Sequence, residues 1–184
     1  MEKNFFDYLI IGAGPAGLQL GYFLEKQQHD YLILETTSRV GSFFEQYPRA
    51  GTLISFNKVY NIYSDPEIQL RWDWNSLLTD NYEFPFRHYS QKLYPKKQEL
   101  TQYLADFVQT YQLKIQFETK VAQVTKQPNG CFTLQDTAGR VYGCRCLIVA
   151  TGFGKEYIPP IQGIDCVTES YGSVSMNPAD FTGQ

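Results

Sequence analysis

The sequence predicts an α/β fold in which a parallel sheet with helices carries a small three-stranded antiparallel meander. Two observations support this. An apolar run, a helix-like run and a second apolar run follow one another within the first 35 residues. The second half then holds an amphipathic stretch, three short alternating segments separated by turns, and a last apolar run. Alternation of strand and helix signals is typical of parallel sheets covered by helices.

The first unit is a strand, a helix and a second strand. Asp7–Ile11 and Tyr31–Leu34 are short apolar runs typical of buried strands. Pro15 stands at a first-turn position, where its missing N–H costs nothing, and opens a helix that runs to about Gln28. This order predicts a right-handed parallel crossover.

Residues 39–96 have a different character. They are rich in aromatic residues, Asn, Asp and Pro, and they show no long periodic pattern. We expect ordered loops and short elements, because disordered segments carry few Tyr, Phe and Trp. Trp72–Asn75 is a dense polar and aromatic stretch, which a buried Trp/Asp hydrogen bond and a substrate contact explain equally well.

The second half gives sharper signals. From Lys97 to Tyr111 apolar residues recur at helical spacing, which predicts an amphipathic helix, and Ile115–Phe117 alternates like a third parallel strand. Good turn compositions separate the strands that follow. These expected strands are Val121–Val124, Cys131–Leu134, Val141–Cys144 and a final buried run, Leu147–Ala150, that leads into Thr151 and Gly152.

Composition excludes several classes of protein. A net charge of −3 without a block of Lys and Arg argues against a nucleic-acid partner. The longest apolar span, Leu9–Leu24, is interrupted and too short to cross a membrane. Glu2 and Asp7 stand where a secretory leader would be basic, so a cytoplasmic location is expected.

Cysteine and histidine spacing predicts no metal site. The four cysteines form no Cys-x-x-Cys pair and the two histidines stand apart. Cys144 and Cys146 share one face of a strand, which favours packing over redox chemistry and leaves a disulfide open.

Three glycines mark a candidate nucleotide site. Gly12, Gly14 and Gly17 lie between a predicted strand and a predicted helix, as the dinucleotide fingerprint requires. Gly12 permits a tight turn, Gly14 leaves room for a pyrophosphate at the helix N-terminus, and Gly17 allows close packing. Glu35 ends the second strand, where a carboxylate accepts ribose hydroxyls and disfavours a 2′-phosphate. The pattern therefore predicts a Rossmann-like domain that binds FAD or NAD, with a purely structural glycine turn as the alternative.

Five stretches resemble the FAD half of flavin-dependent monooxygenases and related two-dinucleotide flavoproteins. One of them departs from the family pattern, because Asn57 and Lys58 are adjacent instead of spaced apart, and another has Val40 and Phe43 in place of a Gly and a Trp. The stretches are GAGPAGL (Gly12–Leu18), RVGSFFEQYP (Arg39–Pro48), LISFNKVYNIYSDP (Leu53–Pro66), the helix and strand over Tyr94–Val121, and VATGFGKEYIPPIQGI (Val149–Ile164).

The resemblance implies FAD as the cofactor and gives individual residues roles. Asn57 is the candidate for chemistry, since an amide there hydrogen-bonds the flavin edge and helps to hold an oxygenated intermediate; an ordinary turn residue is the alternative. Val121 meets adenine through its backbone or is plain strand core. The remaining expected contacts are Gly12, Gly14, Pro15, Ala16 and Gly17 at the pyrophosphate, Glu35 at the ribose, Gly41, Ser42 and Phe43 toward the flavin, and Ala150, Thr151 and Gly152 where the chain leaves the domain.

The resemblance also implies a division of the chain. Residues 1–154 are expected to be an FAD-binding domain with an aromatic-rich insertion at about 39–96, incomplete relative to the two-dinucleotide flavoprotein fold. Residues 155–184 are expected to be a linker toward an NADPH-binding domain, because no second Gly-x-Gly-x-x-Gly follows. We expect a fragment of a longer enzyme; a stand-alone remnant and one half of a two-chain enzyme are the alternatives.

Two functions stay open from the sequence. The first is the FAD-binding portion of an NAD(P)H-dependent oxidoreductase or monooxygenase that cannot turn over alone, with NADPH bound only when the second domain is supplied. The second is a non-catalytic module that binds FAD or an adenine nucleotide. An NAD-dependent dehydrogenase is weaker, because no His or Lys constellation for hydride chemistry is visible. Exposed apolar surface is expected to meet a complementary NADPH-domain segment or a second copy.

Overall fold

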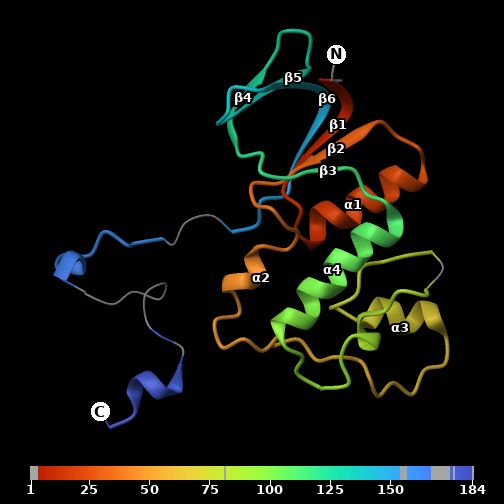
Figure 1. Cartoon of the computed structure of the whole chain (residues 1–184), viewed down its shortest axis with the longest axis vertical. Helices are drawn as coiled ribbons and strands as arrows, with labels where there is room; N and C mark the ends of the chain where they lie inside the picture. Colours follow the sequence, from red (N-terminus) through yellow and green to blue (C-terminus); the bar gives the residue numbers. More distant parts are fainter. Residues whose placement is uncertain (1–3, 81, 154–156, 167–174, 176, 184) are drawn as a thin grey trace. The chain divides into compact units, whose positions relative to one another are not determined.

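The computed structural model describes residues 4–80, 82–153, 157–166, 175 and 177–183. The chain divides into two compact units, residues 1–152 and 153–184. The first unit is a six-stranded mixed sheet with helices and a long insertion (Figure 1). In the second unit the structure describes two short 3₁₀ turns, η2 (Ile164–Cys166) and η3 (Pro178–Phe181). The expected boundary at residues 154 and 155 lies outside the described residues.

The predicted strand–helix–strand unit is confirmed. It consists of β1 (Phe5–Ile11), α1 (Pro15–Lys26) and β2 (Tyr31–Leu34). The two strands run parallel and in register from the pair Tyr8–Tyr31 onward. The helix ends two residues earlier than expected, and Gln28 then turns the chain with a left-handed φ of 56°.

The amphipathic helix and the third parallel strand are also confirmed. They are α4 (Lys97–Tyr111) and β3 (Ile115–Gln116), the latter paired with β2. Gln112 ends α4 in the left-handed region, which satisfies the last carbonyls of the helix. Helices α1 and α4 lie side by side (Figure 1). The buried stripe of α4 is Leu100, Tyr103, Leu104 and Phe107.

The last part of the sheet differs from expectation. The segments Val141–Cys144 and Leu147–Ala150 are not two separate strands. One nine-residue strand, β6 (Val141–Val149), contains the first segment and all of the second except Ala150, which follows the strand. Its first half pairs antiparallel with β5 (Phe132–Asp136), while residues 143–149 pair parallel with β1. The two residues between the expected strands, Arg145 and Cys146, stay within β6 because β1 lies beside this part of the strand.

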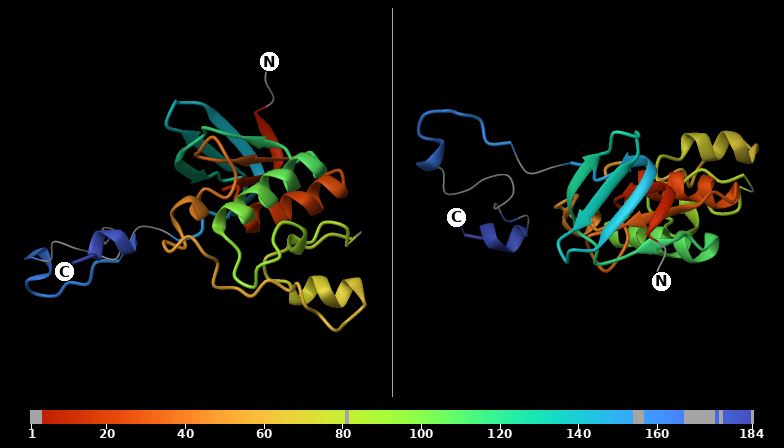
Figure 2. Two further views of the ribbon diagram at one scale, coloured as in Figure 1. Left: turned by 60° about the horizontal axis from the view of Figure 1, so that its bottom comes forward. Right: turned by 90° about the horizontal axis from the view of Figure 1, so that it is seen from above.

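The meander therefore forms part of the main sheet. With β4 (Val121–Lys126) at one edge, the strand order is β3-β2-β1-β6-β5-β4. Figure 1 labels the strands, and Figure 2 shows the same sheet from two further sides. Hydrophobic residues alternate between the two faces of this sheet. Ile10 and Ile33 join the cluster that contains α1 and α4, and Leu9 and Leu34 join a second cluster with β5 and β6.

The insertion consists of ordered loops and short elements, as predicted. These are α2 (Phe43–Gln46), α3 (Pro66–Trp72) and the 3₁₀ turn η1 (Phe86–His88). Side chains of the two long helices attach it to the domain. The Tyr103 hydroxyl accepts from the Leu77 N–H (2.7 Å) and donates to the Phe84 carbonyl (3.2 Å). The Gln19 amide accepts from the Leu78 N–H (2.6 Å) and donates to the Leu78 carbonyl (3.0 Å).

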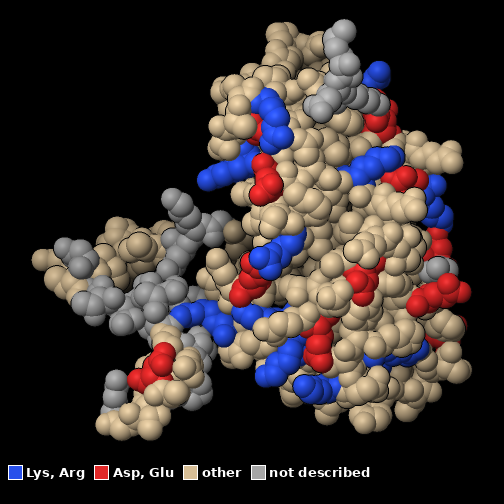
Figure 3. Space-filling model, viewed as in Figure 1, with Lys and Arg blue, Asp and Glu red and all other residues tan. Residues whose placement is uncertain are grey.

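Surface charges of both signs are interspersed on the face shown in Figure 3. Several lie in ion pairs, such as Arg39 with Glu45 (2.7 Å) and Lys114 with Glu25 (3.0 Å).

Among the described helices, none combines the length and apolar character that a membrane span requires. The described residues also contain no cluster of three or more potential metal-ligating His, Cys, Asp or Glu side chains. All four cysteines are free.

Candidate nucleotide-binding site

The glycine turn connects the end of β1 to α1, and two of its glycines are required by the fold itself. Gly12 has a φ of 106°, and a Cβ atom there would lie 2.6 Å from the carbonyl oxygen of Ala150. A Cβ atom on Gly17 would lie 2.1 Å from the carbonyl oxygen of Gly12. Both distances are far below van der Waals contact. Gly12 therefore allows the tight turn, and Gly17 allows α1 to lie against it.

Gly14 is different, because the fold does not require glycine there. Its backbone is extended (φ −80°, ψ 179°), a conformation open to any residue, and a Cβ atom would meet nothing within 4 Å. Gly14 is the N-cap of α1 and provides no side-chain cap for the helix. The first intrahelical bond runs from the Leu18 N–H to the Gly14 carbonyl (3.0 Å), so the amides of Ala16 and Gly17 precede the helical ladder. At the helix N-terminus the space beside the Gly14 Cα atom is thus open.

The Glu35 carboxylate lies against this turn. Its Oε2 atom accepts from the backbone N–H of Ala13 (2.8 Å). Its Oε1 atom accepts from the Thr37 N–H and hydroxyl, both at 2.9 Å. The residue is 6% exposed. Because a carboxylate has about four acceptor positions, one position on Oε2 stays available after these three hydrogen bonds.

Two further predicted segments meet the same turn. The Gly41 N–H donates to the Ala13 carbonyl (3.0 Å), which holds the start of α2 beside the glycine turn. Gly41 has a φ of 65°, and Ser42 and Phe43 continue from it into α2. On the other side the Ala150 N–H donates to the Ile11 carbonyl (2.8 Å), so the end of β6 lies beside the end of β1.

Residues 9–184 match the family described as pyridine nucleotide-disulphide oxidoreductase. The chain belongs to this family. It is 44% identical over 184 residues to FAD-dependent oxidoreductase domain-containing protein 2 of Mus musculus, covering 97% of this chain and 28% of that protein. The resemblance to flavoproteins seen in the sequence is therefore confirmed.

Solved structures of similar proteins agree with the fold. A flavin-containing monooxygenase from Stenotrophomonas maltophilia superposes with a TM-score of 0.71 at 27% identity, covering 88% of this chain and 43% of that one. The bacillithiol disulfide reductase Bdr (YpdA) from Staphylococcus aureus gives a TM-score of 0.63 at 27% identity, covering 81% and 39%. The predicted fold class is thus confirmed, and the chain spans less than half the length of these relatives.

Three of the remaining predicted residues, Thr151, Gly152 and Val121, belong to segments that lead away from Ala150 and Thr119. Thr151 and Gly152 are exposed and follow Ala150 directly. Val121 begins β4, two residues after Thr119, whose N–H donates to the Glu35 carbonyl (2.8 Å).

The sequence analysis did not identify three residues that hydrogen-bond to Glu35, namely Ala13, Thr37 and Thr119. Thr37 could have been found, because a hydroxyl two residues after an acid at the end of a strand often bonds back to it.

Asn57 is buried, with 2% of its surface exposed. Its Nδ2 atom donates to the Ser90 carbonyl (2.6 Å) and its backbone N–H donates to the Leu93 carbonyl (2.9 Å). Its Oδ1 atom has no hydrogen-bond donor in the described part of the chain. A buried acceptor without a partner costs about 1–3 kcal/mol, so this atom is a candidate for a ligand contact.

A cavity of about 170 Å³ lies beside the first residue of α1. Its walls come from α1, α2, α4 and the insertion, and they are mostly apolar. Ser55, Asn75 and Ser76 provide its polar side chains, and Asn57 does not line it. The apolar side chains are Pro15, Phe44, Leu53, Trp74, Leu77, Leu100 and Leu104.

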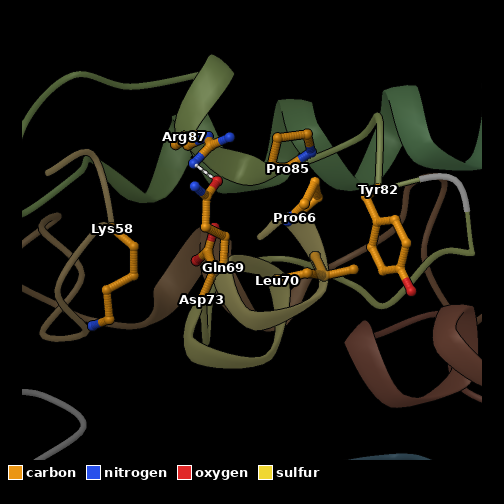
Figure 4. A pocket seen from close by; sticks show the side chains of 8 residues that line it. All are labelled: Lys58, Pro66, Gln69, Leu70, Asp73, Tyr82, Pro85 and Arg87. Carbon is orange, nitrogen blue, oxygen red and sulfur yellow. Dashed lines mark hydrogen bonds between the residues drawn. The ribbon is translucent and has the colours of Figure 1, made fainter. Parts of the chain in front are cut away.

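A second hollow, between α3 and the segment around η1, is much smaller. Figure 4 shows Lys58, Gln69 and Arg87 around it, with the Gln69 side chain hydrogen-bonded to Arg87. Its volume is about 20 Å³. One water needs roughly 10–15 Å³ of such space, so this hollow has no room for a ring. Of these two spaces, only the cavity beside α1 suits part of a cofactor.

Proposed function

We propose that this chain is the FAD-binding portion of an NAD(P)H-dependent flavoprotein oxidoreductase. The observation that carries the proposal is Gly14, whose glycine the fold does not need and whose missing side chain leaves the N-terminus of α1 open. The amides of Ala16 and Gly17, with the positive end of the helix dipole, suit a diphosphate there. Family membership supports the same cofactor, and a relative's name includes FAD dependence.

The other predicted contacts extend this site. The free acceptor position on Glu35 Oε2 suits a ribose hydroxyl of the adenosine half. Val121 would contact adenine through its backbone, and residues 41–43 and 150–152 would surround the cofactor where they meet the glycine turn. Asn57, with its unpartnered Oδ1, stays the candidate for a catalytic contact. When bound, FAD supplies hydride and electron transfer, while these residues bind and orient it.

We propose monooxygenase or related oxidoreductase turnover only for an assembly that also holds NADPH. The 184 residues contain one Gly-x-Gly-x-x-Gly sequence, which the FAD site uses. Residues 155–184 would act as the linker toward the NADPH domain. The alternative, a module that binds FAD without turnover, predicts the same flavin binding and no reduction by NADPH in any longer form of the protein.

Substitution at Gly14 tests the proposal. We expect purified chain to bind FAD, with quenched flavin fluorescence and a perturbed visible spectrum. Gly14→Val should abolish binding of both FAD and ADP. It should lower the melting temperature of the ligand-free protein only modestly, because the added side chain enters open space and the one cost is a less favourable N-cap residue.

Gly130→Ala is the matched control. Gly130 has open space around it but a φ of 86°, so the change should lower stability and leave FAD binding intact. Failure of the wild-type chain to bind FAD, or full binding by Gly14→Val, would refute the proposed site.

The exposed apolar residues of the insertion support a partner for this domain. Ile54 and Ile62 are 89% and 94% exposed, and Trp74 is 79% exposed. Exposed apolar residues in such number are typical of an interface. We propose a complementary NADPH-domain segment as the partner, with self-association as the alternative, and sedimentation of the chain with and without that segment distinguishes the two.

A further inference from the structure

We propose that the insertion carries a docking face for a polypeptide segment in which carboxylates are flanked by apolar side chains. The face consists of Phe56, Lys58, Trp74 and Tyr94 and is called the aromatic–lysine face. The inference rests on the proposed function where it identifies the partner as the complementary NADPH-domain segment. It adds the chemistry by which that segment is recognised.

The four residues of the aromatic–lysine face are in contact with one another. The ring centroids of Phe56 and Tyr94 lie 4.7 Å apart. The Lys58 ammonium lies 5.9 Å from the Phe56 centroid and 5.8 Å from the Trp74 centroid. Phe56, Trp74 and Tyr94 are 50%, 79% and 47% exposed. Three rings that a partner can reach therefore surround one cation.

Backbone hydrogen bonds hold two of the contributing segments together. The Leu53 N–H donates to the Pro95 carbonyl (2.8 Å), and the Asn57 N–H donates to the Leu93 carbonyl (2.9 Å). Leu53, Asn57 and Pro95 are buried, so they anchor the segments from below while the residues beside them stay exposed. The face is thus fixed before any partner binds, which lowers the entropy lost on binding.

The Lys58 ammonium can accept an anionic partner. It donates one hydrogen bond, to the Phe56 carbonyl (3.1 Å), at an exposed position. An ammonium has three donors, and no other acceptor for Lys58 lies in the described part of the chain. Figure 4 shows this ammonium pointing away from the Gln69 and Arg87 side chains. A carboxylate matches such a donor, because hydrogen bonds between charged groups are the stronger ones.

The surrounding charge favours the same kind of partner. Residues 49–64 and 84–98 contain six Lys and Arg and no Asp or Glu, although acids outnumber bases in the whole chain. The acid next to Trp74 is Asp73, which is 5% exposed and accepts hydrogen bonds from the two residues that follow Trp74. An acidic segment would therefore meet attraction here without opposing like charge from these two segments.

The lysines of these segments are not neutralised within the domain. Lys96 Nζ donates to the Thr52 hydroxyl (3.1 Å), and Lys97 Nζ donates to the backbone carbonyl of Glu45 (2.6 Å). Both acceptors are uncharged. The ion pairs among the described residues include neither of these lysines and do not include Lys58. Their charge remains available to a partner.

A polypeptide suits this face better than a lipid surface. Hydrogen-bonded segments and ring contacts fix the positions of its side chains, and Phe, Tyr and Trp are enriched in the buried centres of protein interfaces. A bilayer that contains phosphatidylserine attracts the same lysines, so it enters the test as a competing occupant.

The test measures the binding of two short fluorescent peptides to the wild-type chain by anisotropy. In one peptide Glu alternates with Leu, and in the other Gln takes the place of every Glu. We expect the Glu peptide to bind about ten-fold more tightly, as for one charge-assisted interaction worth ~1.4 kcal/mol. Because the interacting charges are exposed, added salt should reduce this difference.

Lys58→Met tests the ammonium, because it removes the charge and keeps an unbranched apolar side chain. It should lower affinity for the Glu peptide about ten-fold and remove the preference for Glu over Gln. Lys126→Met is the matched control. The Lys126 ammonium also lies 5.9 Å from a phenylalanine centroid, that of Phe132, but outside the insertion. This control should bind both peptides like the wild-type chain.

Tyr94→Ala tests the rings. It should weaken binding of both peptides to a similar degree, because it removes apolar contact and leaves the charge in place. Tyr157→Ala, at a 78% exposed position outside the insertion, should change neither affinity. Melting temperatures report whether each variant is folded, and Lys58→Met decides the question if Tyr94→Ala does not fold.

The outcomes separate this inference from the proposed function. Equal affinity for the two peptides, or an equal loss in Lys58→Met and Lys126→Met, would overturn the docking face. Binding to phosphatidylserine vesicles that depends on Lys58, without binding to the Glu peptide, would also overturn it in favour of a lipid surface. FAD titration of the same samples gives the distinction. FAD binding without peptide binding refutes the docking face alone, and peptide binding without FAD binding refutes the FAD site alone.

Discussion

The Glu35 carboxylate accepts a hydrogen bond of 2.8 Å from the backbone N–H of Ala13, and so joins the end of β2 to the glycine turn. The same carboxylate accepts from Thr37, while the backbone of Glu35 accepts from Thr119. One side chain therefore holds the shape of the turn, and in the proposed site the same side chain would accept a hydrogen bond from the ribose. The acid at residue 35 therefore stabilises the glycine turn through these hydrogen bonds, whether or not a cofactor is bound.

Glu35→Gln should weaken both the fold and the site. The amide nitrogen of Gln cannot accept, so either Ala13 or Thr37 loses its buried acceptor. We expect the free energy of unfolding to fall by about 1–3 kcal/mol and ADP affinity to decrease, measured by chemical denaturation and titration. Unchanged stability together with unchanged ADP affinity would contradict the assigned geometry.

Gly17→Ala should destabilise the domain strongly. The added methyl group would lie 2.1 Å from the Gly12 carbonyl oxygen, so α1 must move away from the turn. We expect a loss of at least ~1–3 kcal/mol, as for overpacking, seen as a lower melting temperature without any ligand. Gly14→Val, which adds a larger side chain three residues earlier but into open space, is the control that should lower the melting temperature much less.

Tyr103→Phe should loosen the insertion. The change removes one hydroxyl and leaves both the Leu77 N–H and the Phe84 carbonyl without this partner. We expect a destabilisation of about 1–3 kcal/mol and faster hydrogen exchange at Leu77. Tyr60→Phe, at an 83% exposed position of the same insertion, should change neither quantity.

Cys144 should be chemically inert in the folded protein. Burial raises the pKa of its thiol to about 11, so at pH 8 only a small fraction is the reactive thiolate. Cys146 and Cys166 are exposed and should react quickly with a thiol reagent at that pH. Cys144 should react only after denaturant is added. Rapid modification of Cys144 in the native protein, identified by mass spectrometry, would contradict its burial.

Asp136 should contribute to acid sensitivity. Burial alone would raise the pKa of its carboxyl, but hydrogen bonds from Arg140 and Ala138, with the charge of Arg140, hold that pKa below its ordinary value. A lowered folded-state pKa adds stability that is present above the unfolded pKa, near 4, and is lost as the pH falls through the folded pKa. Asp136→Asn should therefore destabilise the protein at pH 7 and flatten the acid limb of its stability curve. An unaltered acid limb would be inconsistent with this role.

Local pattern was enough to predict the framework of the site. The spacing of Gly12, Gly14 and Gly17, the acid at Glu35 and the apolar stripe of α4 each depend on residues close together in the sequence, or on helical and strand periodicity. The physical reason is that turn geometry, helix faces and strand faces are set within a few residues. The sequence alone therefore determined the strand–helix–strand unit and the helix before β3, and it singled out the glycine turn that we propose as the diphosphate site.

Only the tertiary structure decided how distant segments meet. The continuity of β6 depends on β1 and β5 pairing with its two halves, and no local signal shows that both partners are present. One cavity has both Pro15 and Asn75 in its wall, sixty residues apart in the chain, and it does not include Asn57, the residue that the sequence nominated for chemistry. Asn57 stays a prediction. Which amide is buried and which partners it bonds depend on packing between distant segments, and the residues beside it in the sequence do not show this.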